Sequence, residues 1–243
     1  MIQTEGIFNG GSDIAAPIIG KDFNWTGGDG TYQVLDDGGE NWRIKFLSSG
    51  TFTPLRNMVI DAFLVGAGGC KGCTHCGAGG SGYTTTVRSI VLAANTAYQI
   101  TIGAAGINPT KAGTDGVDGG TTSAFAASAL GGKGSWAGSS SARKPGADGG
   151  SGGGGVNISG VHVNSSTAAG GTDGEDGATA TTAGGTGQGT TTREFGETDG
   201  DLYASGGGDN LTATVPNSGN GGAYNVEPAD GIVVIRQHKE VAA

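Results

Sequence analysis

The stretch GADGGSGGGG, Gly146 to Gly155, constrains most strongly what this chain can fold into. Glycine loses more backbone freedom on folding than any other residue and has no side chain to bury, so such runs disfavour an ordinary core. Only ten of the 53 glycines lie in the first 62 residues, and none follows Gly231. The region between is either a flexible glycine-rich segment or a structure in which nothing larger than glycine fits.

The spacing of the glycines bears on this choice. Glycines recur three residues apart in four stretches, at 66–72, 113–119, 146–155 and 171–177. Three is the period of an extended helix of the polyproline II type, whose amides and carbonyls point outward and need partners elsewhere. Short helices of this kind could bond to each other laterally, with glycine facing every neighbour. The spacing alone leaves this bundle and a flexible region as equal alternatives, but the broken period and only 6 prolines exclude collagen.

Strand patterns enclose the glycine-rich region on both sides. NWRIKFL places Trp42, Ile44 and Phe46 on one face, and the turn-rich DDGGE joins it to TYQVL as a hairpin. MVIDAFLV, Met58 to Val65, is apolar at nearly every position, as a strand buried on both faces would be. YTTTVRSIVL, AYQITIGA and the closing GIVVIRQH are further strands, and no useful helical periodicity occurs. The sequence therefore predicts an all-β fold with a glycine-rich insertion.

Charge and hydropathy exclude several classes of function. The net charge of −9 argues against a nucleic-acid partner and against binding to an anionic membrane surface. No apolar run approaches the roughly 20 residues that a membrane-spanning helix needs. The first residues, MIQTEGIFNGG, have neither a basic start nor a hydrophobic core, so no signal peptide is expected. A protein of this kind that acts outside the cell is expected to be released by lysis.

The stretch CKGCTHC looks most like a site for chemistry. Cys70, Cys73, His75 and Cys76 offer three sulfurs and an imidazole, a ligand set that suits zinc. Structural zinc sites usually take their ligands from two separated pairs, so a disulfide with a spare thiol, or three free thiols, is favoured over a metal. Zinc or iron stays open as an alternative, because a trimer axis could gather one ligand from each chain. No other cofactor is expected.

Catalysis has little support in the sequence. His75, His162 and His238 are scattered, no serine lies in a nucleophile elbow, and no pair of carboxylates stands out. We therefore expect that the protein is not an enzyme.

An ordered set of motifs points to a known family. IDAFLVGAGGCKG, GAGGSGYTTT, AYQITIGAAG, GGTTSAF, GQGTTTREFGE and GIVVIRQ follow one another across residues 60–237. This order resembles the glycine-rich domain proteins of phages and prophages of Gram-positive gut bacteria, which are tail-fibre or tail-tip components. They are similar in style to the glycine-rich adhesins of T-even-like phages, in which a sandwich of polyglycine II helices carries receptor-contacting loops at its far end. The substantial N-terminal β region departs from those adhesins.

The resemblance completes the expected fold and function. We expect an antiparallel β-sandwich-like part, closed by the C-terminal strand, with an inserted bundle of polyglycine II-type helices. The expected regions are an N-terminal β region for attachment (1–62), a glycine-rich domain with strands at 83–102 (63–230), and a closing strand with a tail (231–243). The expected function is that of a phage tail adhesin, located on the virion. The alternative is a structural or self-assembling subunit that binds no receptor.

The expected partners are a bacterial surface glycan or wall polymer, other tail proteins and further copies of the chain in a homotrimer. Recognition is expected in the loops, because loops on a rigid scaffold usually carry binding function. The candidate loops are Ser135–Lys144, Val156–Ser166 and Asp209–Tyr224. The candidate receptor-binding residues are Trp136, Arg143, Lys144, His162 and Tyr224. Aromatic rings can stack on sugars and basic groups can meet anionic polymers, whereas the plainer alternative is that each residue only covers the outside of the bundle.

Overall fold

The fold is all-β, as predicted from the sequence. The computed structural model describes residues 16–38, 41–72, 75–139, 144–155, 157–158, 161–162, 175–177, 184–186, 191–208, 214–223 and 226–238. Within these ranges no α-helix occurs, and the single helical element is a 3₁₀ turn, η1 (Glu194–Gly196). The strands are β1 (Phe23–Trp25), β2 (Tyr32–Gly38), β3 (Asn41–Phe46), β4 (Gly50–Pro54), β5 (Met58–Val65), β6 (Thr84–Leu92), β7 (Tyr98–Thr101), β8 (Thr122–Ala124), β9 (Ala127–Ala129), β10 (Asn157–Ile158), β11 (Val161–His162) and β12 (Ile232–Gln237).

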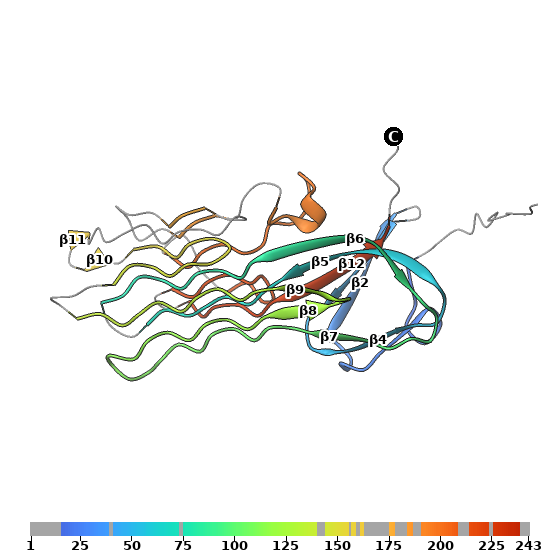
Figure 1. Cartoon of the computed structure of the whole chain (residues 1–243), viewed down its shortest axis with the longest axis horizontal. Coiled ribbons are helices and arrows are strands. Elements are labelled where there is room, and N and C mark those ends of the chain that lie inside the picture. The colour runs from blue at the N-terminus through green and yellow to red at the C-terminus, as the bar shows by residue number, and fades with distance from the viewer. Residues whose placement is uncertain are drawn as a thin grey trace, which may run out of the picture.

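Two five-stranded antiparallel sheets form one end of the molecule (Figure 1). Sheet I has the order β1-β4-β7-β8-β9, and sheet II has the order β2-β3-β12-β5-β6. The expected hairpin is β2–β3, in which Val34 pairs with Ile44. β12 pairs with both β3 and β5, so strands from the beginning and the end of the described chain share one sheet.

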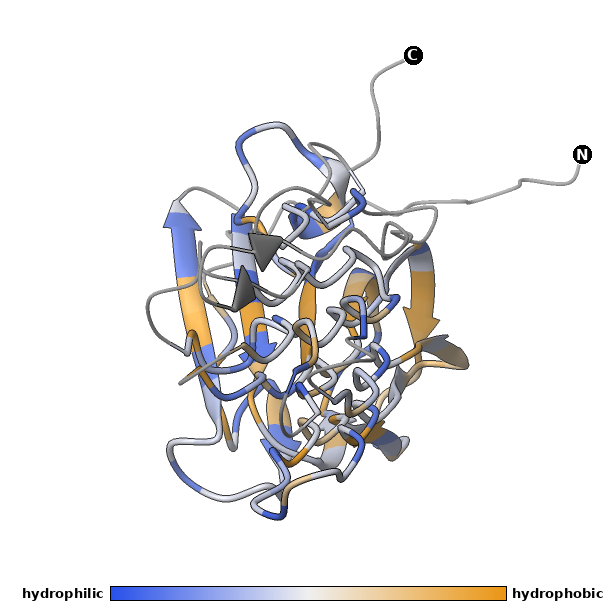
Figure 2. Ribbon diagram, turned by 90° about the vertical axis from the view of Figure 1, so that its left-hand side faces the viewer, coloured by the Kyte–Doolittle hydropathy of each residue, from blue (hydrophilic) through white to orange (hydrophobic). Residues whose placement is uncertain are grey.

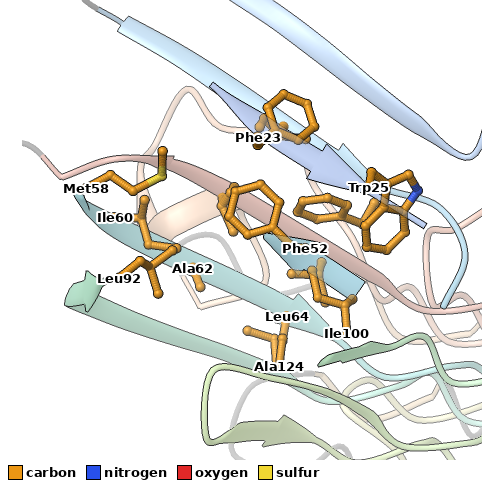
Figure 3. Close-up of a cluster of buried hydrophobic side chains, with 14 of the residues drawn as sticks. Phe23, Trp25, Phe52, Met58, Ile60, Ala62, Leu64, Leu92, Ile100 and Ala124 are labelled. Atoms are coloured by element: carbon orange, nitrogen blue, oxygen red, sulfur yellow. The ribbon is translucent and has the colours of Figure 1, made fainter. Parts of the chain in front are cut away.

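The inner faces of the two sheets enclose the main hydrophobic core (Figure 3). Trp42, Ile44 and Phe46 are buried in it, as their alternation predicts. Phe52 from sheet I lies 5.5 Å from Phe46 between ring centroids, in an edge-to-face arrangement. Because fully burying one large apolar side chain contributes about 1.5–3 kcal/mol, this layer is the main apolar stabilisation of the sandwich.

The outer face of sheet II is also covered, which explains why β5 is apolar on both sides. Phe63 and Val65 point into a second cluster that includes Phe195 and Tyr203. The rings of Phe63 and Tyr203 lie 5.6 Å apart. The segment around η1 thus covers the outer face of sheet II. The strand Met58–Val65 is buried on both faces, as expected, except at Val59, which is 41% exposed.

The glycine-rich residues form extended segments that run away from the sheets to the opposite end of the molecule (Figure 1). Viewed along the long axis they lie side by side and are mostly pale or blue, whereas the strands carry the orange of apolar residues (Figure 2). Backbone hydrogen bonds between segments join them, such as Gly69 N–H to Gly80 O at 2.9 Å and Gly119 N–H to Gly132 O at 2.8 Å. The glycine-rich region is therefore held together mainly through its main chain.

The hydrogen bonds follow a period of three along residues 77–83. Amides three residues apart donate to carbonyl groups of the same neighbouring segment. Ala78 and Ser81 donate to Gly154 and Ser151, respectively, and Gly79 and Gly82 donate to Gly222 and Gly219. Gly80 and Tyr83 donate to Lys133 and Leu130. Carbonyl groups of the same stretch accept from three further segments, through the amides of Gly69, Ala147 and Gly207. Six segments thus surround residues 77–83.

Glycine is required where these segments approach each other. A Cβ atom added to Gly80, Gly82 or Gly69 would overlap a backbone carbonyl of the adjoining segment, well under the 3.0 Å that real Cβ atoms essentially never cross. None of these three glycines needs a positive φ, so the reason is steric exclusion and not backbone conformation. The glycine runs are therefore explained by close packing of main chain on main chain.

Candidate functional site

The turns that join the glycine-rich segments gather at the end of the molecule opposite the sheets (Figure 1). We call this the distal end and define it by residues 70–72, 75–76, 107–118, 133–139 and 144. Cys76 and Lys144 lie on adjacent segments whose main chains form an isolated parallel β-bridge. Lys144 N–H donates to His75 O at 3.0 Å. The cysteine-rich turn and the loop that carries Trp136 are therefore neighbours.

Trp136 projects from a rigidly held backbone at the distal end. Its side chain is 66% exposed, although the residues on either side of it are fixed by hydrogen bonds. Ser135 N–H donates to Cys70 O at 3.0 Å, the Ser135 hydroxyl donates to Gly77 O at 2.6 Å, and Ala137 N–H donates to Asp115 Oδ1 at 2.8 Å. An aromatic ring is thus presented to solvent at little further cost in conformational entropy.

Lys144 lies beside this ring. Its Nζ is 5.7 Å from the centroid of the Trp136 ring, within the range of a cation–π interaction. Of the predicted receptor-binding residues, the structure therefore brings Trp136 and Lys144 together. Arg143 and Tyr224 lie outside the described residues, and His162 lies in the short strand β11 (Figure 1).

Two apolar residues are exposed at the distal end. Ile107 is 76% exposed and Val117 is 52% exposed. The neighbouring Lys133 and Asp118 form an exposed ion pair at 2.7 Å. The distal end thus offers aromatic, aliphatic and charged groups on one frame, a mixture that is typical of binding surfaces.

The two cysteines that the structure describes fix the distal turns. The Cys70 thiol donates to Ile107 O at 2.9 Å and accepts from Val117 N–H at 2.9 Å. The Cys76 thiol donates to Gly72 O at 2.7 Å. Burial raises the pKa of Cys70, more than the hydrogen bond from Val117 lowers it, which favours the neutral thiol over the thiolate that a metal needs.

The prediction of a metal or disulfide at this turn also involves Cys73, which lies outside the described residues. Cys70 forms no disulfide. Nowhere in the described part of the chain do three or more potential His, Cys, Asp or Glu ligands come together. The metal alternative stays a prediction for this turn.

The third candidate loop, Asp209–Tyr224, is not a single distal loop. Asn217 lies at the sheet end, where its side-chain amide donates to Leu47 O at 3.0 Å and Gly231 O at 2.9 Å. From there the chain re-enters the glycine-rich region, where Gly219 and Gly222 accept from the segment 77–83. Residues 209–213 and Tyr224 of this loop lie outside the described residues.

The sequence did not indicate a network of charged groups on the outer face of sheet II. Glu194 in η1 is 1% exposed and pairs with Lys45 at 2.6 Å and with Arg43. The Tyr203 hydroxyl donates to the same carboxylate at 2.7 Å. A cavity of about 250 Å³ adjoins Arg43 and Glu194. Because Arg43 and Lys45 are more than 140 positions away from Glu194 and Tyr203, no spacing motif signals the network.

A comparison with models of protein families identifies the family of this chain. The model of the glycine-rich domain matches residues 47–236, which is most of the chain. The chain belongs to this glycine-rich domain family. The matched part of this glycine-rich domain protein begins just after β3 and reaches into β12, so it includes strands of both sheets as well as the glycine-rich segments.

One further comparison and one structural observation concern this glycine-rich domain protein. A search of curated proteins finds no match. Among the residues that the structure describes, none forms a helix with the length and apolarity that a membrane span requires.

Proposed function

We propose that the glycine-rich region is a bundle of polyglycine II-type helices. Three observations support this assignment: the amides along residues 77–83 change partner with a period of three, six segments surround this stretch, and a Cβ atom does not fit at Gly69, Gly80 or Gly82. A helix with three residues per turn and no internal hydrogen bonds directs its main-chain groups outward in this manner. Such a bundle is stiff where a segment is bonded to several others, as residues 77–83 are.

On this frame we propose a receptor-binding protein of a phage tail, an adhesin that recognises a bacterial surface glycan or wall polymer through the distal end. The observation that carries the proposal is the exposed Trp136 ring, fixed at its backbone and flanked by Lys144. A flat aromatic face can stack on a sugar ring, and the Lys144 ammonium can pair with an anionic group of the same polymer. Arg143 would add a second positive charge.

The phage context of the proposal comes from the ordered motifs across residues 60–237, which resemble phage and prophage tail proteins. In this proposal the β region opposite the distal end attaches the protein to other tail proteins, in a homotrimer or singly. The protein acts on the virion and is released by lysis. It requires no metal or other cofactor for binding.

Adsorption of the purified protein to intact Gram-positive cells tests the proposal. We expect the wild-type chain to bind and Trp136→Ala to weaken binding about tenfold or more, as truncation of an aromatic anchor typically does. Ile18→Ala is the matched control, because Ile18 is 52% exposed but lies just before β1, outside the distal end and the three candidate loops. Its binding should equal that of the wild type.

Two outcomes would overturn the proposal. Wild-type binding that is unaffected by Trp136→Ala would remove the distal end from recognition. If the protein binds no cells or wall polymer but assembles into fibres or onto tails, the alternative of a structural subunit replaces the adhesin. Thermal unfolding of each variant establishes that a loss of binding is not a loss of folding.

A further inference from the structure

Three residues far apart in the sequence meet on the outer face of sheet II. The Ser89 hydroxyl oxygen is 3.1 Å from Nε2 of His238, and Nδ1 of His238 is 2.6 Å from Oδ1 of Asp61. An ionised carboxylate only accepts hydrogen bonds, so Nδ1 of His238 carries a proton, and in the tautomer with this single ring proton Nε2 accepts from the Ser89 hydroxyl. This is the order of a nucleophile, a general base and an orienting carboxylate.

A β-bulge places the serine. Ile60 pairs with Ile90 and Ala62 pairs with Val87, so Asp61 alone lies opposite both Arg88 and Ser89. Ser89 has a φ of 57°, the left-handed conformation that non-glycine residues rarely adopt. Bulges are enriched beside active sites because they redirect one side chain. Here the bulge turns the Ser89 hydroxyl toward His238.

Asp61 holds the arrangement in place. Its carboxylate is fully buried and also accepts from Ser89 N–H at 3.1 Å, from Arg236 Nε at 3.2 Å and from Arg88 Nη1 at 3.3 Å. Burial acts to raise the pKa of Asp61, but the hydrogen bonds from His238, the Ser89 amide and Arg236 outweigh it and keep the pKa below its usual value. The carboxylate is therefore ionised at neutral pH and fixes one orientation of the imidazole.

Ser89 and His238 are both accessible to solvent, and His238 borders a cavity. Ser89 is exposed, and the His238 side chain is 20% exposed. His238 adjoins a cavity of about 430 Å³ whose lining includes Met58, Val59 and Val91. Val91 is 75% exposed at its edge. The cavity is large enough for a small apolar group beside His238.

We propose that Ser89 and His238 form the catalytic pair of a serine esterase site, with Asp61 as the positioning residue, acting on carboxylic esters with a small apolar acyl group. The Ser89 oxygen forms a bond to the ester carbonyl carbon while His238 Nε2 takes the hydroxyl proton. The bond between that carbon and the alcohol oxygen then breaks, and His238 returns the proton to the leaving alcohol. Water hydrolyses the acyl-serine by the same two proton transfers, which releases the acid and restores the hydroxyl.

This activity is independent of the proposed adhesin function and lies at the opposite end of the molecule from Trp136. The sequence led us to expect no enzyme because its histidines are scattered. The fold brings one of these histidines to a serine 149 residues away and to an aspartate 177 residues away. Catalytic triads are recognised by such geometry and not by sequence order.

Labelling of the full-length protein with a fluorophosphonate tests the proposal directly. An activated serine displaces fluoride from the probe and forms a phosphonyl ester, so peptide mass spectrometry should place the adduct on Ser89. Ser89→Ala and His238→Asn should both abolish the adduct. Ser128→Ala, an exposed serine on β9, should label as the wild type does.

Hydrolysis of p-nitrophenyl acetate gives a second readout. The rate above the uncatalysed background should fall about 100-fold in Ser89→Ala and in His238→Asn, the usual scale for loss of a nucleophile or general base. Absence of an adduct on wild-type Ser89, or labelling that survives His238→Asn, would overturn the proposal. The wild-type result decides the matter even if a variant fails to fold.

Discussion

Replacement of Gly80 by alanine tests whether close packing of main chain holds the glycine-rich region together. Gly80 donates to Lys133 O at 3.0 Å and accepts from Gly69 N–H at 2.9 Å. A Cβ atom at this position would overlap Asp148 O, which itself accepts from Lys133 N–H at 2.8 Å. To reach a tolerable contact, the two backbones would have to separate by about 1 Å.

The expected cost follows from these contacts. A separation of that size weakens three backbone hydrogen bonds, each of net value about 1 kcal/mol. Alanine also reduces the freedom of the unfolded chain, which offsets about 0.4–1 kcal/mol. We therefore expect Gly80→Ala to lower the free energy of unfolding by about 2 kcal/mol and the melting temperature by about 4–8 °C for a domain of this size.

Thermal unfolding followed by circular dichroism, together with amide hydrogen exchange across residues 77–83, measures this effect. Ala104→Val is the control, because Ala104 lies exposed on the segment between Gly103 and Gly106 and already has a Cβ atom. Its free energy of unfolding should change by no more than about 0.5 kcal/mol. If Gly80→Ala melts within 1 °C of the wild type, or if the 77–83 amides exchange within seconds in the wild type, the packing argument fails.

Two further predictions concern titratable groups. Because the pKa of Asp61 is held below its ordinary value of 3.8 in the folded state, the unfolded state binds more protons in acid. The stabilisation that the Asp61 carboxylate contributes is complete at neutral pH and is lost as the pH falls through 3.8 toward the pKa of the folded state. The melting temperature should therefore drop most steeply below pH 4. A constant melting temperature from pH 5 to pH 2.5 would contradict this prediction. The buried Cys70 thiol, whose pKa is raised by burial, should resist iodoacetamide at pH 8 until the protein is unfolded in urea, as peptide mapping of Cys70 would show. Rapid native alkylation of Cys70 would mean that the distal turn is open.

The sandwich could be predicted because its signals are local. The alternation of Trp42, Ile44 and Phe46 specifies which face of β3 is buried, and the apolar run at Met58–Val65 indicates cover on both faces. The residues that pack against the outer face of β5 could not be predicted from such local patterns. The cover on the outer face comes from Phe195 and Tyr203, more than 130 residues along the chain.

Glycine-rich segments resist prediction for a different reason. One glycine run is sterically equivalent to another, so nothing in the sequence specifies that residues 77–83 lie between Gly69, Ala147 and Gly207. The proximity of Trp136 and Lys144 could be predicted from the sequence because a single loop carries both residues. Ser89 and His238 could not, since their contact depends on a bulge whose position no local pattern marks.

The dominance of main-chain contacts in the glycine-rich region affects how stability depends on temperature. Exposure of apolar surface raises the heat capacity on unfolding, whereas exposure of polar surface lowers it. Opening the sandwich exposes aromatic and aliphatic side chains, while separating the glycine-rich segments exposes chiefly peptide groups. The two parts of the molecule should thus have differently curved stability profiles. Cooling weakens the apolar core first and leaves the glycine-rich frame almost unaffected.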